Sequence, residues 1–143
     1  MELKQEIPRF LTHGTTSLGY ESLKNHGIKS FNKGMQFWGY EDSISNIHSA
    51  IGFAVKRAVF NKERQIFQYG KPVVLVIDSS KELVITRANT ASNIFYVYGN
   101  LDSKNHILIR IVNPFIERES YSAQVDSLER KAFKARDLND FLI

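Results

Sequence analysis

The feature that most constrains the fold is an uninterrupted run of apolar residues, Pro72–Ile77. The run has the length of a strand and shows no alternation with polar residues, which is the pattern of a strand buried on both faces of its sheet. A chain of 143 residues is long enough for one domain with a real core, and no low-complexity run or linker divides it. We therefore expect a single domain, residues 1–143.

Two short helices are expected before this run. The first begins after a capping hydroxyl among residues 15–17 and ends at Gly27, because glycine favours the left-handed backbone that follows many helices. The second begins at Asp42 or Ser43 and ends near Phe60. Its helical spacing creates one apolar stripe: Ile44, Ile47, Ile51, Ala54, Val55 and Ala58.

Most of the remaining chain is predicted to form strands. An aromatic loop with a glycine, Phe31–Trp38, leads into an edge strand. The other expected strands are Ile7–Thr12, Glu82–Thr86, Ile94–Tyr98 and His106–Val112, with Tyr121–Val125 as a further candidate and Asp137–Ile143 as a closing strand or turn of helix. Helices early and strands late in the chain indicate the α+β class.

Composition excludes several kinds of protein. The chain has no cysteine, so disulfides and thiolate metal sites are excluded, and no histidine spacing predicts a metal site. No stretch approaches the roughly 20 apolar residues of a membrane helix, and the polar start does not fit a signal peptide. We expect a cytoplasmic protein without metal or membrane partner. The net charge of +4 is compatible with a nucleic acid or an acidic partner, but it does not distinguish them.

The segment Phe10–Thr16 is the candidate for chemistry, because it places His13, Gly14 and Thr15 between a predicted strand and a predicted helix. A glycine there lets another group come close to the backbone, since it has no side chain. The same residues also occur in ordinary strand-to-helix turns. Both interpretations are open from these residues alone.

The order of these features resembles the ADP-ribosyltransferase fold. The features are a strand with His-Gly-Thr, a helix ending at Gly27-Ile28, an aromatic loop, a helix with Ala50, Phe53 and Ala54, and then the run Pro72–Ile77. The chain looks most like the branch whose signature is His, then an aromatic residue (usually Tyr), then Glu, and the resemblance covers roughly residues 8–126. It implies an α+β split β-sandwich with two short N-terminal helical segments.

The resemblance also implies roles for His13, Gly14 and Thr15. It implies that the protein uses NAD as a substrate, with His13 holding the adenosine-side ribose and the Gly14 backbone binding the nicotinamide amide. Thr15 adds a hydroxyl contact. At the aromatic position the chain has Trp38, which can stack on the cationic nicotinamide ring as a tyrosine does. A shifted alignment uses Gln36 or Tyr40 instead, and a core position is the structural alternative for Trp38.

The third signature position departs from the family. Cleaving the nicotinamide bond builds positive charge on the ribose, which a carboxylate stabilises. At the matching point, in the predicted strand Tyr121–Val125, the chain has Gln124, which can bind a hydroxyl but has no charge. Glu119, in a Glu-x-Glu spacing with Glu117, is the alternative carboxylate, and a solvated loop is the structural explanation for both glutamates.

The resemblance therefore predicts a mono-ADP-ribosyltransferase that modifies a protein or nucleic-acid acceptor and releases nicotinamide. A toxin or effector of this kind often has a neutralising partner protein. The alternative is a catalytically weak or inactive member that binds NAD or nucleic acid. An RNA 2′-phosphotransferase shares the fold, but Arg87, Arg110 and Arg118 do not form a compelling phosphate-binding set. Without the resemblance, the aromatic loop is a protein-interaction patch on an α+β domain.

Overall fold

The computed structural model describes residues 7–28, 35–39, 43–87 and 93–142. Within this part of the chain, six strands form an antiparallel sheet in the order β6-β7-β2-β1-β5-β8. These strands are β1 (Phe10–Thr16), β2 (Met35–Trp38), β5 (Pro72–Asp78), β6 (Val84–Arg87), β7 (Ile94–Tyr98) and β8 (His106–Arg110). A separate hairpin pairs β3 (Phe60–Asn61) with β4 (Ile66–Phe67).

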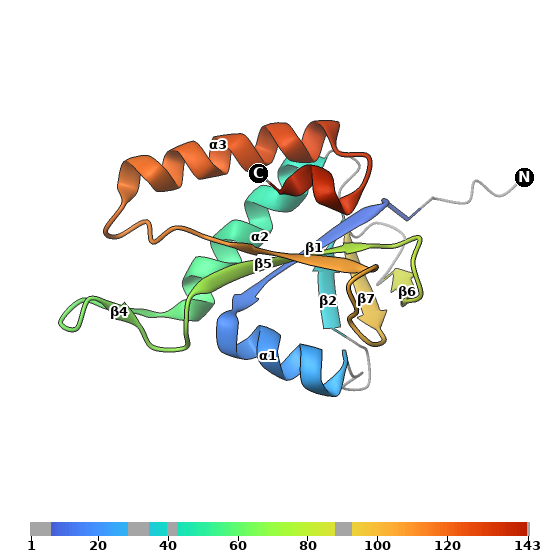
Figure 1. Ribbon diagram of the computed structural model, residues 1–143, viewed down its shortest axis with the longest axis horizontal. Helices are drawn as coiled ribbons and strands as arrows, with labels where there is room; N and C mark the ends of the chain where they lie inside the picture. The colour runs from blue at the N-terminus through green and yellow to red at the C-terminus, as the bar shows by residue number, and fades with distance from the viewer. Residues whose placement is uncertain (1–6, 29–34, 40–42, 88–92, 143) are drawn as a thin grey trace, which may run out of the picture.

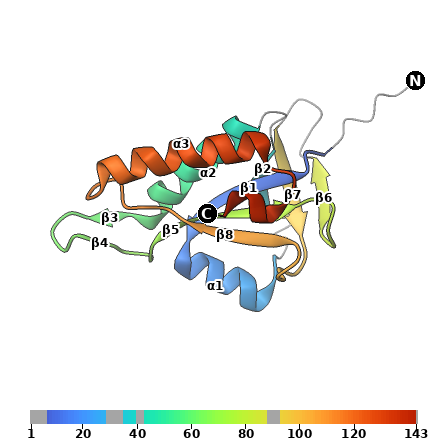
Figure 2. The same cartoon turned by 45° about the horizontal axis from the view of Figure 1, so that its top comes forward.

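Helices cover both faces of the sheet. They are α1 (Ser17–His26), α2 (Ser43–Ala58), α3 (Arg118–Lys134) and the short 3₁₀ helix η1 (Leu138–Phe141). Figures 1 and 2 show α2 and α3 on one face and α1 on the other, with the β3–β4 hairpin projecting beyond the sheet. The α+β class predicted from the sequence is confirmed. None of the helices in the described residues is long and apolar enough to cross a membrane.

Strand β5 lies at the centre of the core, as its apolar run predicts. Every one of its residues is buried. Val74 and Val76 belong to the cluster under α2 and α3, whereas Leu75 and Ile77 belong to the cluster on the α1 side. Burial of each such side chain stabilises the fold by about 1.5–3 kcal/mol relative to leaving it exposed. A strand with two apolar faces thus holds the two layers together.

Helix α2 crosses β1 at Gly14. A Cβ atom on Gly14 would lie 2.0 Å from the carbonyl oxygen of Ala50 and 2.5 Å from the backbone nitrogen of Ala54. Ala50 and Ala54 are fully buried, and their small side chains permit this approach. Glycine is therefore required at this position for helix packing.

Several predicted boundaries are confirmed. Thr16 caps α1 by accepting a hydrogen bond from the Gly19 N–H at 3.1 Å. Gly27 ends α1 with φ 76°, and its N–H donates to the Leu23 carbonyl. Strand β7 spans Ile94–Tyr98 as predicted, and the closing turn of helix is η1.

Other predictions are wrong. Residues 121–125 lie inside α3 rather than in a strand, because Tyr121, Val125, Leu128 and Ala132 form a helical stripe against the core. Because α3 is late, the expected order of early helices and late strands also fails. Strand β2 is not an edge strand, since it lies between β7 and β1. Strand β1 continues through His13 to Thr16 instead of ending at Thr12.

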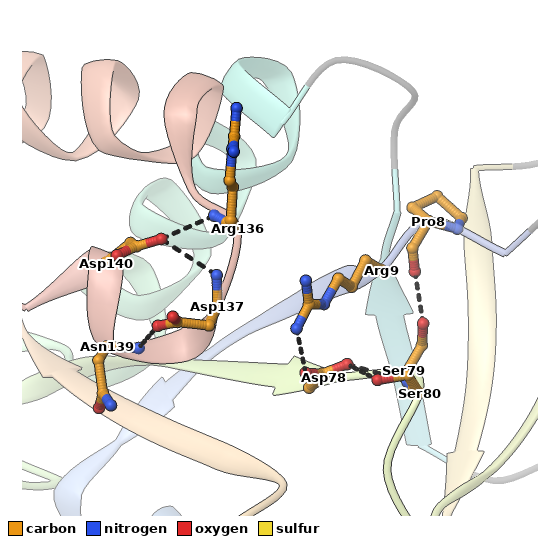
Figure 3. A network of polar contacts seen from close by, with 9 residues as sticks. All are labelled: Pro8, Arg9, Asp78, Ser79, Ser80, Arg136, Asp137, Asn139 and Asp140. Atoms are coloured by element: carbon orange, nitrogen blue, oxygen red, sulfur yellow. Dashed lines mark hydrogen bonds and ion pairs between the residues drawn. The ribbon is translucent and has the colours of Figure 1, made fainter.

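Polar contacts fix the outer end of β1 and β5 (Figure 3). The Arg9 guanidinium lies 3.4 Å from the buried carboxylate of Asp78, which also accepts hydrogen bonds from the hydroxyl and the N–H of Ser80. Burial alone would raise the pKa of Asp78, but these hydrogen bonds and Arg9 hold it below its ordinary value. Nearby, Asp137 and Asp140 form the capping box of η1.

We predict that Gly14→Ala destabilises the protein by about 1–3 kcal/mol or more, because the new methyl group meets helix backbone that cannot move aside. The matched control is Gly52→Ala in α2 itself, where the added Cβ would meet nothing within 4 Å. Gly52 is an exposed residue of α2, so alanine there is expected to stabilise by about 0.5–1 kcal/mol. Urea unfolding measures both, and equal effects would contradict the close approach of α2 to β1.

Candidate functional site

Strands β1 and β2 are paired over only a short stretch. Strand β1 pairs with β5 along its whole length, from Phe10 opposite Asp78 to Thr16 opposite Pro72. Among the described residues, by contrast, it pairs with β2 only where Thr12 lies opposite Trp38. The backbone pairing with β2 therefore stops before His13 and Gly14, and we call this break in the pairing the opening between β1 and β2.

The His13 side chain bridges this opening. Its Nδ1 atom lies 2.8 Å from the backbone carbonyl oxygen of Gln36 on β2, and its ring lies 5.2 Å from the ring of Phe37. The His13 residue is only 8% exposed. A side-chain hydrogen bond thus connects β1 and β2 beyond their backbone pair.

Arg57, in the last turn of α2, reaches the same opening. Its Nη1 atom lies 3.0 Å from Nε2 of His13 and donates a hydrogen bond of 2.5 Å to the Gly14 carbonyl. The guanidinium also lies 5.4 Å from the ring of Phe53, one helical turn earlier, which orients the long side chain. We call His13, Gly14, Arg57 and the Gln36 carbonyl the His13 cluster.

The partners of His13 fix its tautomer. A carbonyl oxygen can only accept, so Nδ1 carries the proton, and a guanidinium can only donate, so Nε2 carries the lone pair. Burial and the charge of Arg57 lower the pKa of His13 from 6.5 to about 4, although the Gln36 carbonyl acts in the opposite direction. Burial also lowers the pKa of Arg57. His13 is therefore neutral at physiological pH.

Comparisons of the chain with protein-family models, with curated proteins and with solved structures found no match.

The residues of the His13 cluster interact through hydrogen bonds. An arginine offers five N–H donors, of which the contacts above use one nitrogen, so the guanidinium can also bind an anion such as a phosphate. Within the described residues, no group of three or more His, Cys, Asp or Glu side chains is placed to hold a metal ion.

Gln124 and Glu119 lie on α3, away from this cluster. The Gln124 amide donates to the Arg110 carbonyl at 2.7 Å and accepts from the Val112 N–H at 2.8 Å, at the far end of β8. Glu119 is an exposed residue in the first turn of α3. The structure therefore does not bring Gln124 or Glu119 together with His13, because the predicted strand that would have aligned them is a helix.

Thr15, Trp38 and Tyr40 are the other predicted site residues. Thr15 follows Gly14 on β1 and is half-buried. Trp38 is the last residue of β2, where its backbone pairs with Thr12 and Ile94, but its side chain is outside the described part of the chain. Tyr40 also lies outside the described residues.

Arg57 is the site residue that sequence reasoning missed. Its position in the sequence, off the apolar stripe of α2 and beside Lys56, is typical of a solvated helix end. The available signal was its spacing of four residues from Phe53, which places the two side chains on one helix face. That spacing predicts an oriented arginine, but it does not predict which strand the arginine reaches.

We predict that protonation of His13 destabilises the fold. Its pKa is about 4 in the native protein and 6.5 when unfolded, so the unfolded chain binds the proton first as the pH falls. The stabilisation is complete above pH 6.5 and is lost between pH 6.5 and about 4, by on the order of 3 kcal/mol. Urea unfolding across this range should show a larger loss for the wild type than for His13→Asn, which does not titrate.

We also predict that Arg57→Ala raises the native pKa of His13, because a neighbouring positive charge is removed. The pKa should remain below 6.5, since burial is the larger cause of its depression. NMR titration of the imidazole measures this shift, with Lys56→Ala as the control at the adjacent exposed position. An unchanged pKa in Arg57→Ala would contradict the contact between the two side chains.

Proposed function

We propose that this protein binds NAD at the opening between β1 and β2 and transfers ADP-ribose to a protein or nucleic-acid acceptor, with release of nicotinamide. The observation that carries the proposal is the His13 cluster, in which an imidazole, a glycine carbonyl and a guanidinium meet at this opening. The ordered resemblance to ADP-ribosyltransferases adds support. If the chain has the split β-sandwich that the resemblance implies, the single backbone pair between β1 and β2 would correspond to the split.

Arg57 gives the proposal a specific feature. It occupies both Nε2 of His13 and the carbonyl oxygen of Gly14, which are atoms that a bound NAD needs. The guanidinium therefore has to leave them, and the pyrophosphate of NAD offers it a charge-assisted partner. Arg57 is an exposed residue, so this movement disturbs little of the core. We propose that Arg57 exchanges its internal contacts for the phosphates when NAD binds.

A second candidate function is binding of NAD or a nucleic acid without turnover. Turnover needs a negative charge, such as a carboxylate, near the ribose, because positive charge builds up there. Among the described residues, the hydrogen-bonding partners of the His13 cluster include no carboxylate, which favours this second candidate. Gln124 and Glu119 remain proposals for that role, but each would require α3 or its first turn to approach the cluster.

Calorimetric titration of NAD, with nicotinamide release followed by chromatography, tests both candidates. The wild type is expected to bind NAD, and Arg57→Ala should weaken binding about tenfold or more because a phosphate contact is lost. His13→Asn should weaken it too, since it removes the acceptor at Nε2 while keeping a short polar side chain. Lys56→Ala, an exposed change on the same helix end, should bind as the wild type does.

Each outcome has a distinct meaning. Binding with release supports the transferase, and the same assay with candidate acceptors then identifies what is modified. Binding without release, with any acceptor, supports the second candidate. A folded wild type that does not bind NAD overturns the proposal at this site.

A further inference from the structure

A cleft of about 460 Å³ lies between the β3–β4 hairpin and the segment that follows β8. Phe67, Pro72 and Ile111 contribute apolar surface to it, and Lys71 and Arg110 contribute positive charge. None of these residues belongs to the His13 cluster. The volume suits a flat organic group such as a nucleobase, and it is far too small for a folded partner.

The hairpin wall of this cleft is held by aromatic packing. The Phe60 ring packs edge-on against Phe67 across the hairpin, with ring centroids 5.4 Å apart. On its other side Phe60 stacks on Phe115, beyond β8, at 4.8 Å with nearly parallel planes. Val59, which joins α2 to the hairpin, has φ 51°, a conformation that β-branched residues rarely adopt. Strain of this kind concentrates at functional sites.

The two cations are positioned by their backbones. The Lys71 N–H donates to the Ser17 hydroxyl at 3.1 Å, and the Lys71 carbonyl accepts from the Ser17 N–H at 2.9 Å. The Arg110 carbonyl is held by the side-chain amide of Gln124. Lys71 and Arg110 are nevertheless exposed residues. The backbones are thus fixed while the charged groups face solvent.

Among the described residues, neither Lys71 nor Arg110 forms an ion pair. The hairpin turn carries two further cations, Lys62 and Arg64, with Glu63 between them. Glu117 contributes a carboxylate to the lining of the cleft. Cations that line an apolar cleft and continue on the neighbouring hairpin turn are complementary to a polymer that carries repeated phosphates and flat bases.

We propose that this cleft binds single-stranded nucleic acid. One base packs on the apolar surface at Phe67, Lys71 and Arg110 contact the flanking phosphates, and the hairpin turn meets the strand further along. A mononucleotide would not use the turn, so affinity should rise with strand length. In the proposed transfer reaction this polymer is the acceptor, and that statement alone rests on the proposed function.

Fluorescence anisotropy of labelled single strands of about 12 nucleotides, as DNA and as RNA, tests the proposal. The assay contains no NAD, so its result is independent of the proposed reaction. The double variant Lys71→Ala/Arg110→Ala should weaken binding at least tenfold at about 50 mM salt and lower the salt slope by about 1.4. The matched control, Lys81→Ala/Lys104→Ala, removes the same charge from exposed residues in other loops and should bind nearly as the wild type does.

Two single variants separate stacking from charge. Phe67→Leu keeps apolar volume in the hairpin but removes the ring face, and it should weaken binding about fivefold or more. Glu117→Gln should strengthen binding, because it removes the negative charge that lines the cleft. Glu117 makes no side-chain hydrogen bond at the start of α3, so this change leaves the helix intact.

Tight binding of DNA, RNA or both, with these variant effects, supports the site, and the two probes name the nucleic acid. Equal losses in the two double variants would mean that net charge alone attracts the strand, which overturns the proposal. The absence of binding at about 50 mM salt would also overturn the proposal. So would a polyglutamate peptide that binds as tightly as the nucleic acid, if Phe67→Leu also leaves the affinity for nucleic acid unchanged.

Discussion

Backbone meets backbone where helix α2 crosses β1 at Gly14, and the site depends on this contact. Any Cβ atom there would lie 2.0 Å from the carbonyl oxygen of Ala50, so a larger residue would push the helix away from the sheet. The end of α2 would then withdraw from the opening between β1 and β2. Arg57 reaches His13 because the helix lies this close to the strand. Helix α2 ends at Ala58, the residue after Arg57, and the β3–β4 hairpin begins at Phe60.

Neutral imidazoles connect parts of the fold that backbone hydrogen bonds leave apart. His13 on β1 donates a hydrogen bond to the Gln36 carbonyl of β2 and accepts one from Arg57 of α2. His106, also buried, accepts from the Tyr20 hydroxyl at 2.9 Å and donates from Nδ1 to the Asp102 carbonyl. Burial lowers the pKa of His106 as it does that of His13. A neutral imidazole has one donor and one acceptor on separate atoms, which suits it to bridging of this kind.

Local patterns predicted the elements whose environment is uniform. The run Pro72–Ile77 identified the central strand because both of its faces are covered, and Gly27 marked a helix end because its backbone is left-handed. The segment Tyr121–Val125 misled, because it has a strand former at each end and is too short to show the helical stripe that Leu128 and Ala132 complete.

The candidate site was predictable only in part. His13 and Gly14 stand out in the sequence, but Arg57 is 44 residues from His13, and periodicity describes only neighbours along the chain. The same limit applies to Gln124, whose partners lie 12 and 14 residues before it, just beyond β8 and at its last residue. Side chains that bond across elements depend on packing, which the sequence pattern does not encode locally.

Strand β8 is the last strand of the described sheet, and such an edge is where other chains can add. The Ile111 N–H points inward, donating to the Pro72 carbonyl, so the carbonyl of Arg110 and the N–H of Val112 point outward. These are the two groups that the Gln124 amide occupies. Its side chain imitates one residue of a neighbouring strand and, by doing so, protects this end of the edge from aggregation with another sheet.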